Sequence, residues 1–276
     1  MKIKQVLSAL EQFAPLPLQE SWDNAGLQLG LTEAEVSGAL LCLDVNEAII
    51  DEAISKGCNL IVSHHPLLFR GLKQISGADY VQRCVIKAIK HDIVIISMHT
   101  NMDNAQGGVN FKIAERLGAT VLNVSLTDGQ SVALQSASTV LSGLAAEQEK
   151  TPLVLAELPH PMDARAFIEL VKKQFGVQCA QCNALLERPI RKVAICGGAG
   201  DFLLPDAISQ DADAFITGEM HYHQYFGCEQ QIQICVIGHY QSEQFTSEIF
   251  RDIIQKECPG VRTEIAETST NPIVYI

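Results

Sequence analysis

The sequence predicts an α/β protein made of two α/β portions, each with a largely parallel sheet flanked by helices. Two observations lead to this prediction. Short aliphatic runs alternate with segments of helical periodicity between residues 38 and 117, and the same alternation returns between residues 191 and 257. Such alternation is typical of parallel sheets covered on both faces. With 276 residues, of which 47% are hydrophobic, the chain can bury one large core or two smaller ones.

The first portion begins with an amphipathic helix. Gln5, Ser8 and Glu11 interrupt the apolar residues of the N-terminus, which favours a helix over a signal peptide. Asn46 is a suitable N-cap for a helix that runs to residue 54. The other expected elements of this portion are strands at 38–44, 60–63 and 93–98 and helices at 80–91 and 108–117.

Periodicity weakens between residues 121 and 189. Residues 136–151 are rich in Ser, Ala, Glu and Gly and predict a loop, whereas residues 162–175 look helical. After this stretch we expect strands at 191–196, 214–217 and 232–237 and helices at 203–210, 220–226 and 243–257. The predicted division is an N-terminal portion, 1–124, and a portion at 125–276 that includes the irregular connection, with both contributing to one metal site.

Composition excludes several classes of partner. The chain has 20 basic and 32 acidic residues, a net charge of −12, so nucleic acid and anionic membranes are not expected partners. No apolar run is long enough to span a bilayer, and a cytoplasmic location is expected. Nine cysteines in mostly apolar contexts argue against a disulfide framework. Cys179 and Cys182 form the single CxxC pair, whose role as a redox or zinc element stays open.

Three polar clusters directly follow predicted strands. They are Ser63–Pro66, His99–Asp103 and Gly238–Glu243. Because the carboxyl ends of parallel strands meet at one edge of a sheet, His and carboxylate side chains at these positions can converge. The three clusters together therefore favour a metal site at the strand ends, between the two portions.

The histidine doublet His64-His65 follows the strand at 60–63. Pro66 keeps the residue before it out of the helical region, and neighbours in extended backbone point in different directions. The doublet therefore suits two metals, or one ligand and one supporting group. The alternative is a pair of histidines bonded to backbone carbonyls.

Asp103 is a candidate ligand because a carboxylate can bridge two cations and neutralise their charge. His99, four residues earlier, is a candidate to ligate a metal or to orient its neighbours. The alternative role of Asp103 is that of a turn or helix-capping residue.

His239 and Glu243 are four residues apart, which places both on one face of a helix. An exposed His–Glu pair is the alternative. Glu219 and His223 have the same spacing and are candidates for acid–base chemistry, or ordinary polar residues of a helix.

Basic and glycine-rich segments add two candidate anion sites. Arg70 and Lys73 could hold a phosphate, although exposed basic residues are commonly only solvated. Gly197–Gly200 could cradle an anion, but this segment matches neither the dinucleotide-binding nor the P-loop pattern.

The chain resembles the Nif-three-like family of dinuclear metal-centre hexameric proteins, also called GTP cyclohydrolase I type 2 homologues. The resemblance runs in order through nearly the whole chain, in a compact form without the inserted domain of larger members. It is carried by Ser21–Gln28, Ser63–Leu67, Arg70–Lys73, His99–Asp103, Cys196–Gly200, Thr217–Glu219, and Gly238-His239 with Glu243.

This resemblance implies a dinuclear centre of two divalent ions per subunit, in a ring-shaped homohexamer built as a trimer of dimers. The implied ligands are His64, His65, Asp103, His239 and Glu243. The sequence does not choose among zinc, iron, manganese and nickel, because mixed His and carboxylate ligation suits all four.

The resemblance and the predicted site indicate a metal-dependent hydrolase that acts on a nucleotide or phosphorylated substrate through a metal-bridging hydroxide. The family name implies opening of the purine ring of GTP with loss of formate. Glu219, His223 and His99 are the candidate catalytic residues for proton transfer. The alternatives are a phosphoesterase and a non-catalytic, metal-binding scaffold or regulatory assembly.

Overall fold

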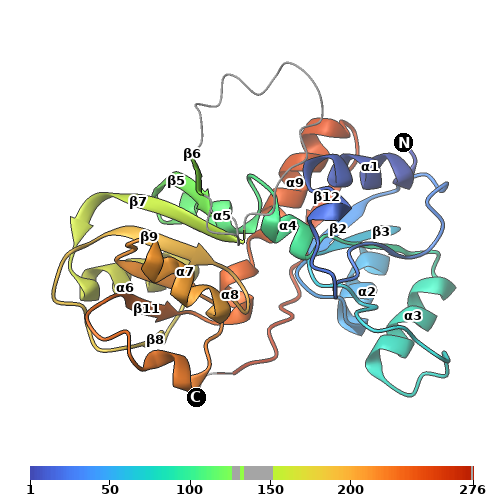
Figure 1. Ribbon diagram of the computed structural model, residues 1–276. Helices are drawn as coiled ribbons and strands as arrows, with labels where there is room; N and C mark the ends of the chain where they lie inside the picture. The colour runs from blue at the N-terminus through green and yellow to red at the C-terminus, as the bar shows by residue number, and fades with distance from the viewer. Residues whose placement is uncertain (126–130, 134–151, 275) are drawn as a thin grey trace. The chain divides into compact units, whose positions relative to one another are not determined.

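The computed structural model describes residues 1–125, 131–133, 152–274 and 276 (Figure 1). These residues form two compact units, one of Met1–Ala105 with Phe245–Ile276 and one of Gln106–Gln244. The second unit is thus inserted into the first. This division differs from the expected boundary after residue 124, because the C-terminal helix and strand pack with the N-terminal elements. The α/β class itself is confirmed.

The sheet of the first unit is mainly parallel and has the strand order β1-β4-β3-β2-β12. The four strands from β4 to β12 run parallel, and β1 is antiparallel to β4 at the edge. The strands span Gly26–Leu29 (β1), Ala39–Cys42 (β2), Leu60–Ser63 (β3), Val94–Ser97 (β4) and Thr263–Ile265 (β12).

Helices cover both faces of this sheet. α9 contacts α1 and the strands β2 and β3, whereas α2 contacts α3 and the same two strands. Figure 1 shows α1 and α9 on one side of the sheet and α2 and α3 on the other. The helices of this unit are α1 (Ile3–Phe13), η1 (Leu16–Leu18), α2 (Glu47–Ser55), α3 (Tyr80–Lys90), α4 (Thr100–Asn104) and α9 (Thr246–Glu257).

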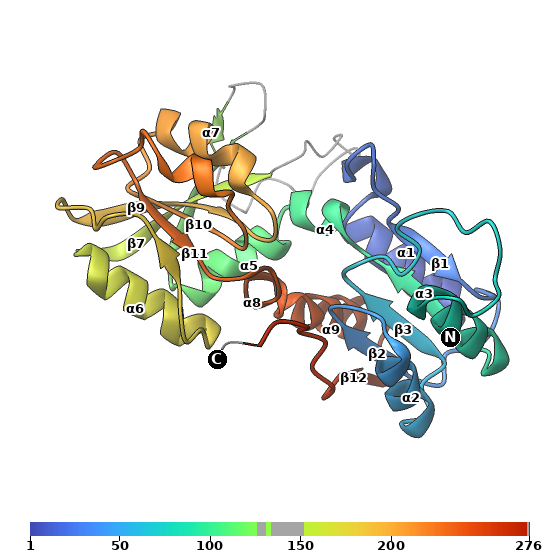
Figure 2. The ribbon, with the colours of Figure 1, turned by 90° about the horizontal axis from the view of Figure 1, so that it is seen from below.

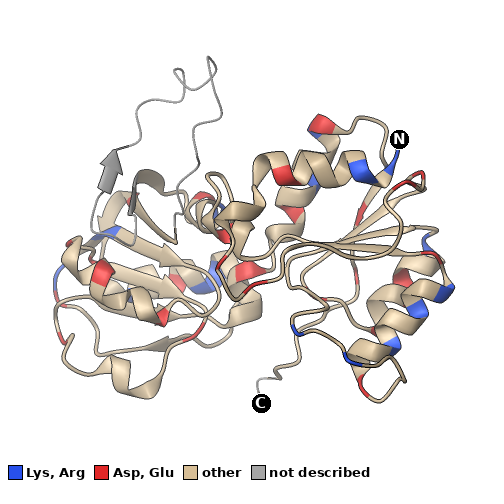
Figure 3. Cartoon of the chain, turned by 45° about the vertical axis from the view of Figure 1, so that its right-hand side comes forward, with Lys and Arg blue, Asp and Glu red and all other residues tan. Residues whose placement is uncertain are grey.

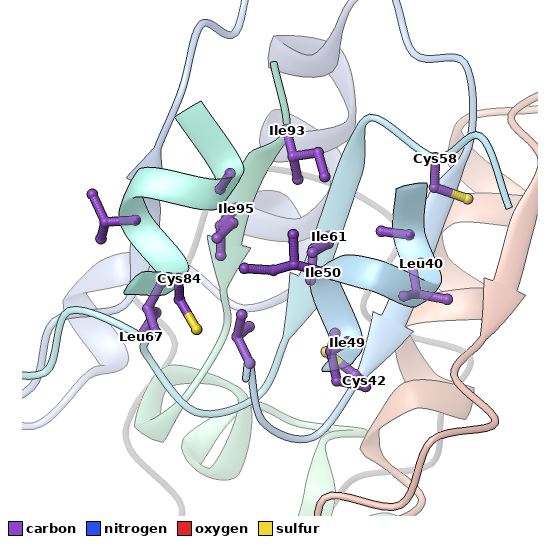
Figure 4. Packing of buried hydrophobic residues seen from close by; sticks show 14 residues of the cluster. Leu40, Cys42, Ile49, Ile50, Cys58, Ile61, Leu67, Cys84, Ile93 and Ile95 are labelled. Atoms are coloured by element: carbon purple, nitrogen blue, oxygen red, sulfur yellow. The ribbon is translucent and has the colours of Figure 1, made fainter. Parts of the chain in front are cut away.

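The core of the first unit explains why its strands read as unbroken apolar runs. Leu40, Ile61 and Ile95 lie at matching register on three neighbouring strands and are fully buried. Ile49 and Ile50 of α2 pack on them in one hydrophobic cluster (Figure 4). Burial on both faces removes the polar alternation of a half-exposed strand.

The sheet of the second unit is mixed, with the order β6-β5-β7-β9-β10-β11-β8. Its centre, β9 to β11, is parallel, and the flanking pairs are antiparallel. The strands span Thr120–Ser125 (β5), Ser131–Ala133 (β6), Leu153–Met162 (β7), Gln181–Cys182 (β8), Ile190–Cys196 (β9), Ala214–Thr217 (β10) and Gln233–Val236 (β11).

Helices also flank this second sheet. Figure 2 shows α6 and α7 on opposite sides of the strands, and α5 contacts β5, β7 and β9. The helical elements are α5 (Val109–Arg116), α6 (Ala164–Phe175), η2 (Asp201–Leu203), α7 (Leu204–Ser209), η3 (Tyr222–Tyr225) and α8 (His239–Glu243).

Several expected elements differ from the structure. Among the described residues, the weakly periodic stretch contains the strands β5, β6 and β8 and the ten-residue strand β7. The helix expected at 220–226 is only the short 3₁₀ turn η3, and the one expected at 243–257 is divided into the end of α8 and α9. The loop expected at 136–151 lies outside the described residues.

Cys182 pairs across strands with Cys235 rather than with its sequence neighbour Cys179. The two Cα positions are partners in the antiparallel β8–β11 ladder. A hydrogen bond with the Cys235 thiol lowers the pKa of Cys182. No disulfide joins the cysteines that the structure describes, in agreement with the expectation from their apolar contexts.

Charged residues of both signs are distributed over several elements of each unit (Figure 3). None of the helices built from the described residues has the length and apolar character needed to cross a bilayer.

Glu52 of α2 fastens the C-terminal segment to the first unit. Its carboxylate accepts hydrogen bonds from the backbone amides of Glu267 and Thr268, at 2.8 and 3.0 Å, and pairs with Lys56 at 3.0 Å. Burial alone would raise the pKa of Glu52. The hydrogen bonds from Thr268, the Glu267 amide and Lys56 outweigh burial and lower the pKa to about 2.

We predict that Glu52→Gln destabilises the protein at pH 7 and not at pH 2. A carboxyl whose pKa is lower in the folded than in the unfolded chain stabilises the fold above its unfolded pKa of about 4.5, and this contribution is lost as the pH falls to about 2. We expect a loss of about 1 kcal/mol at pH 7, reduced by solvent screening.

Urea unfolding followed by the fluorescence of Trp22, the one tryptophan of the chain, measures this difference in the first unit. Glu47→Gln is the matched control, because Glu47 lies on the same helix and pairs with Arg83 in an exposed ion pair. An effect of Glu52→Gln that is the same at both pH values would contradict the prediction.

Candidate metal centre

Three imidazoles of the first unit lie together at the carboxyl ends of β3 and β4. His64 and His65 follow β3, and His99 follows β4. The register pairs Ser63 with Ser97, so the two strand ends lie side by side. Ligand nitrogens of the three rings lie within 4.8 Å of one another, and the ring centroids are 4.9 to 5.3 Å apart. The predicted convergence of His64, His65 and His99 is present within this unit.

Each of these rings has its Nδ1 on an oxygen atom. His64 Nδ1 lies 2.9 Å from the Met98 carbonyl oxygen. His65 Nδ1 lies 2.7 Å from Asp44 Oδ1, and His99 Nδ1 lies 2.7 Å from Asp23 Oδ1. An oxygen acceptor at Nδ1 selects the tautomer whose Nε2 carries a lone pair, which is the arrangement found in histidines that bind metals.

Asp103 adds a carboxylate to this imidazole cluster. It lies on α4, directly after β4, and its Oδ1 is 3.5 Å from His64 Nε2. His64 is fully buried, whereas Asp103 is partly exposed. The carboxylate thus lies on the Nε2 side of the ring, where a ligand would bind.

Sequence reasoning missed the two carboxylates that orient the rings, Asp23 and Asp44. Burial alone would raise the pKa of Asp23, but the hydrogen bonds with His99 and Thr100 lower it to about 2. Burial alone would also raise the pKa of Asp44, but its hydrogen bonds with His65 and Thr270 lower it. Both are therefore ionised acceptors at neutral pH. Their sequence signal was position, because Asp44 ends a predicted strand and Asp23 lies inside the Ser21–Gln28 motif.

The second unit holds a similar pair on α8. His239 Nε2 lies 3.1 Å from Glu243 Oε2, as the four-residue spacing predicts. His239 Nδ1 lies 3.0 Å from Glu219 Oε1, on the loop after β10. Glu219 therefore orients an imidazole as Asp23 and Asp44 do in the first unit.

Glu219 and His223 do not lie on one helix, although their four-residue spacing predicted a shared helical face. Glu219 precedes the turn η3, which contains His223. The His223 ring is exposed and packs beside Tyr222 and Phe226, with centroids 5.3 and 6.2 Å away. The ring contacts of His223 therefore involve neighbouring aromatic residues.

The glycine-rich loop after β9 provides the space for the Glu243 carboxylate. A Cβ atom at Gly198 would lie 2.3 Å from Glu243 Oε1, and Gly198 has a φ of +62°. The Gly198 amide donates a hydrogen bond of 3.0 Å to Ser242 Oγ on α8. The loop that could have cradled an anion is thus packed against a candidate ligand, whose side chain is only 4% exposed.

The donor sets of the two units fit divalent transition metals. Imidazole nitrogen with carboxylate oxygen suits zinc, iron, manganese and nickel, whereas calcium and magnesium prefer oxygen alone. The first unit offers His64, His65, His99 and Asp103, and the second offers His239 and Glu243.

Related proteins match all or most of the chain. A Campylobacter jejuni protein called GTP cyclohydrolase 1 type 2 homolog is 31% identical over 277 residues, covering 100% of both chains. A Clostridium perfringens protein with the same name is 33% identical over 247 residues, covering 88% of this chain and 87% of its own.

Solved structures share the fold. The crystal structure of a Staphylococcus aureus protein has a TM-score of 0.84 at 26% identity, covering 100% of this chain and 99% of its own. A Bacillus cereus protein related to NIF3 has a TM-score of 0.82 at 24% identity, with the same coverage. The model of the family Duf34/NIF3 (NGG1p interacting factor 3) matches residues 1–272. The chain therefore belongs to the Duf34/NIF3 family.

Proposed function

We propose that this protein binds two divalent metal ions and acts as a metal-dependent hydrolase on a nucleotide or phosphorylated substrate. The observation that carries the proposal is the common orientation of four imidazoles. His64, His65, His99 and His239 each have Nδ1 on an oxygen acceptor, which directs a basic Nε2 toward a ligand. The Met98 carbonyl that orients His64 would also serve a purely structural histidine, whereas His65, His99 and His239 each have a carboxylate at Nδ1, as is common for imidazoles that bind metals.

Chain connectivity supports a single centre that uses ligands from both units. The chain leaves the first unit after Ala105, two residues beyond Asp103, and returns to it after Gln244, one residue beyond Glu243. Each candidate acid is thus tied by the backbone to a crossing between the units. We propose His64, His65, Asp103, His239 and Glu243 as the ligands.

The chemistry divides between bound ions and side chains. Divalent ions would supply Lewis acidity and favour ionisation of water near neutral pH. His99 and Glu219, next to the proposed ligands, are suited to hold or move a proton, and exposed His223 remains a predicted third candidate. Arg70 and Lys73, both exposed, could bind a substrate phosphate.

The names of the relatives support a nucleotide substrate, because several are called GTP cyclohydrolase 1 type 2 homolog. Metal-loaded protein assayed with GTP and with a panel of phosphate esters tests this substrate class. Release of formate from GTP supports the cyclohydrolase reaction, and release of phosphate or alcohol from an ester supports a phosphoesterase.

Protein that binds metal and turns over neither kind of substrate would contradict the hydrolase and favour a scaffold.

The family resemblance also supports a homohexamer. Light scattering tests this assembly, because a molar mass well below about six chains would exclude it.

We predict that His64→Ala and Glu243→Ala, from different units, each weaken the binding of both ions. In one shared centre the ions depend on each other through common ligands, so the effects should be non-additive. Metal content after dialysis and zinc titration by calorimetry measure this. His91→Ala and Glu257→Ala, at exposed sites, are the matched controls.

Two independent sites would behave differently in the same titrations. Each single variant would then lose one ion and leave the other with unchanged affinity, and the double variant would show the sum of the two losses. That result would contradict a centre shared between the units, although metal binding itself would stand.

We further predict that Gly198→Ala lowers metal affinity by about tenfold or more. The new methyl group would overlap the Glu243 carboxylate and displace it from its buried position. Gly176→Ala is the matched control, because Gly176 has nearly the same φ, +65°, with no atom within 4 Å of the added Cβ. Equal loss of affinity in both variants would point to backbone strain instead of displacement of Glu243.

A further inference from the structure

Two large aromatic side chains lie exposed beside the imidazole cluster of the first unit. Trp22 is 59% exposed and Phe69 is 46% exposed. Their ring centroids lie 5.9 Å apart, and they lie 6.1 and 6.3 Å from His99. Exposed rings of this size forgo the free energy of burial, so their position beside a candidate site requires a physical reason.

A hydrogen-bond network holds the two loops that carry these rings. Asn24 Nδ2 donates to the Leu68 carbonyl at 2.7 Å, and the Leu68 amide donates to Gln28 Oε1 at 3.1 Å. Gln28 Nε2 donates in turn to the Asn24 carbonyl at 2.6 Å. The loops that carry Trp22 and Phe69 are therefore tied together, so their backbones have little conformational entropy left to lose on binding.

Asp23 fixes the Trp22 loop against the residues that follow β4. Its side chain is fully buried, with Oδ1 on His99 Nδ1 at 2.7 Å and Oδ2 accepting from the Thr100 amide at 3.0 Å. The same residue thus orients an imidazole and anchors the backbone next to Trp22. Asp23 therefore links the loop of the aromatic pair to the imidazole cluster.

We infer that Trp22 and Phe69, whose ring planes are tilted by 59°, form an aromatic platform for the planar ring of the substrate, which stacks on one ring and meets the other edge-on. This inference rests on the proposed function and narrows the substrate to compounds with an aromatic base. Every nucleobase has a π face that stacks on Trp or Phe. Exposed Arg70 follows Phe69 directly and offers a positive charge to a phosphate in a chain of net charge −12. The occupant is therefore a nucleotide rather than a sugar phosphate or a simple ester.

Trp22 fluorescence tests this platform directly, because the chain has no other tryptophan. We expect guanosine monophosphate to quench the emission saturably and ribose 5-phosphate, which lacks a base, to leave it unchanged. Phe69→Leu keeps the fluorophore and should weaken binding of guanosine monophosphate by about tenfold. Phe226→Leu, at a 60% exposed aromatic residue of the second unit, is the matched control.

Titrations on metal-free protein separate this inference from the proposed function. Saturable quenching without metal supports the platform even if the protein hydrolyses nothing, and intact metal binding without quenching overturns the platform alone. A second copy of the chain on these rings is the rival occupant. Trp22 emission that shifts to the red as the assembly is diluted, with no quenching by guanosine monophosphate, would establish that occupant instead.

Discussion

The orientation of the imidazole rings is the constraint on which the candidate metal centre depends. A histidine side chain rotates about two bonds, so a strand end fixes its position but not the direction of its nitrogens. In this protein the Met98 carbonyl and the carboxylates of Asp23, Asp44 and Glu219 complete the constraint. The backbone and the acceptors together fix rings that could receive a metal without reorganisation.

Different parts of the fold fix the position of each ring and the direction of its nitrogens. Parallel strands bring His64 and His99 together because their ends share one edge of the sheet. The acceptors come from loops, and Asp23 lies 76 residues before the histidine that it orients. In the second unit, a glycine without a side chain completes the site by leaving room for an acid. The site therefore depends on tertiary structure as much as on the residues that would contact the ions.

The sequence could predict those parts whose signals are local. The aliphatic run at 60–63, the Asn46 cap and the spacing of His239 and Glu243 all report on neighbouring residues, and the structure contains each of them. β7 was not predictable in this way, because Pro159 and Pro161 interrupt its run of strand-forming residues. Its pairing with β5 and β9, which are distant in sequence, is what makes this segment a strand. β12 has only three residues and gains its place by pairing with β2. The oriented rings escaped prediction for the same reason, since their acceptors are distant in sequence.

The insertion of one unit into the other sets an order of events during synthesis. All residues of the inserted unit, 106–244, emerge from the ribosome before the last helix and strand of the surrounding unit emerge. The inserted unit can therefore fold on the nascent chain, whereas β2 must wait for β12 and α1 for α9. Until then, the faces that those late elements cover are exposed, and a nascent chain paused before residue 245 would present them to chaperones.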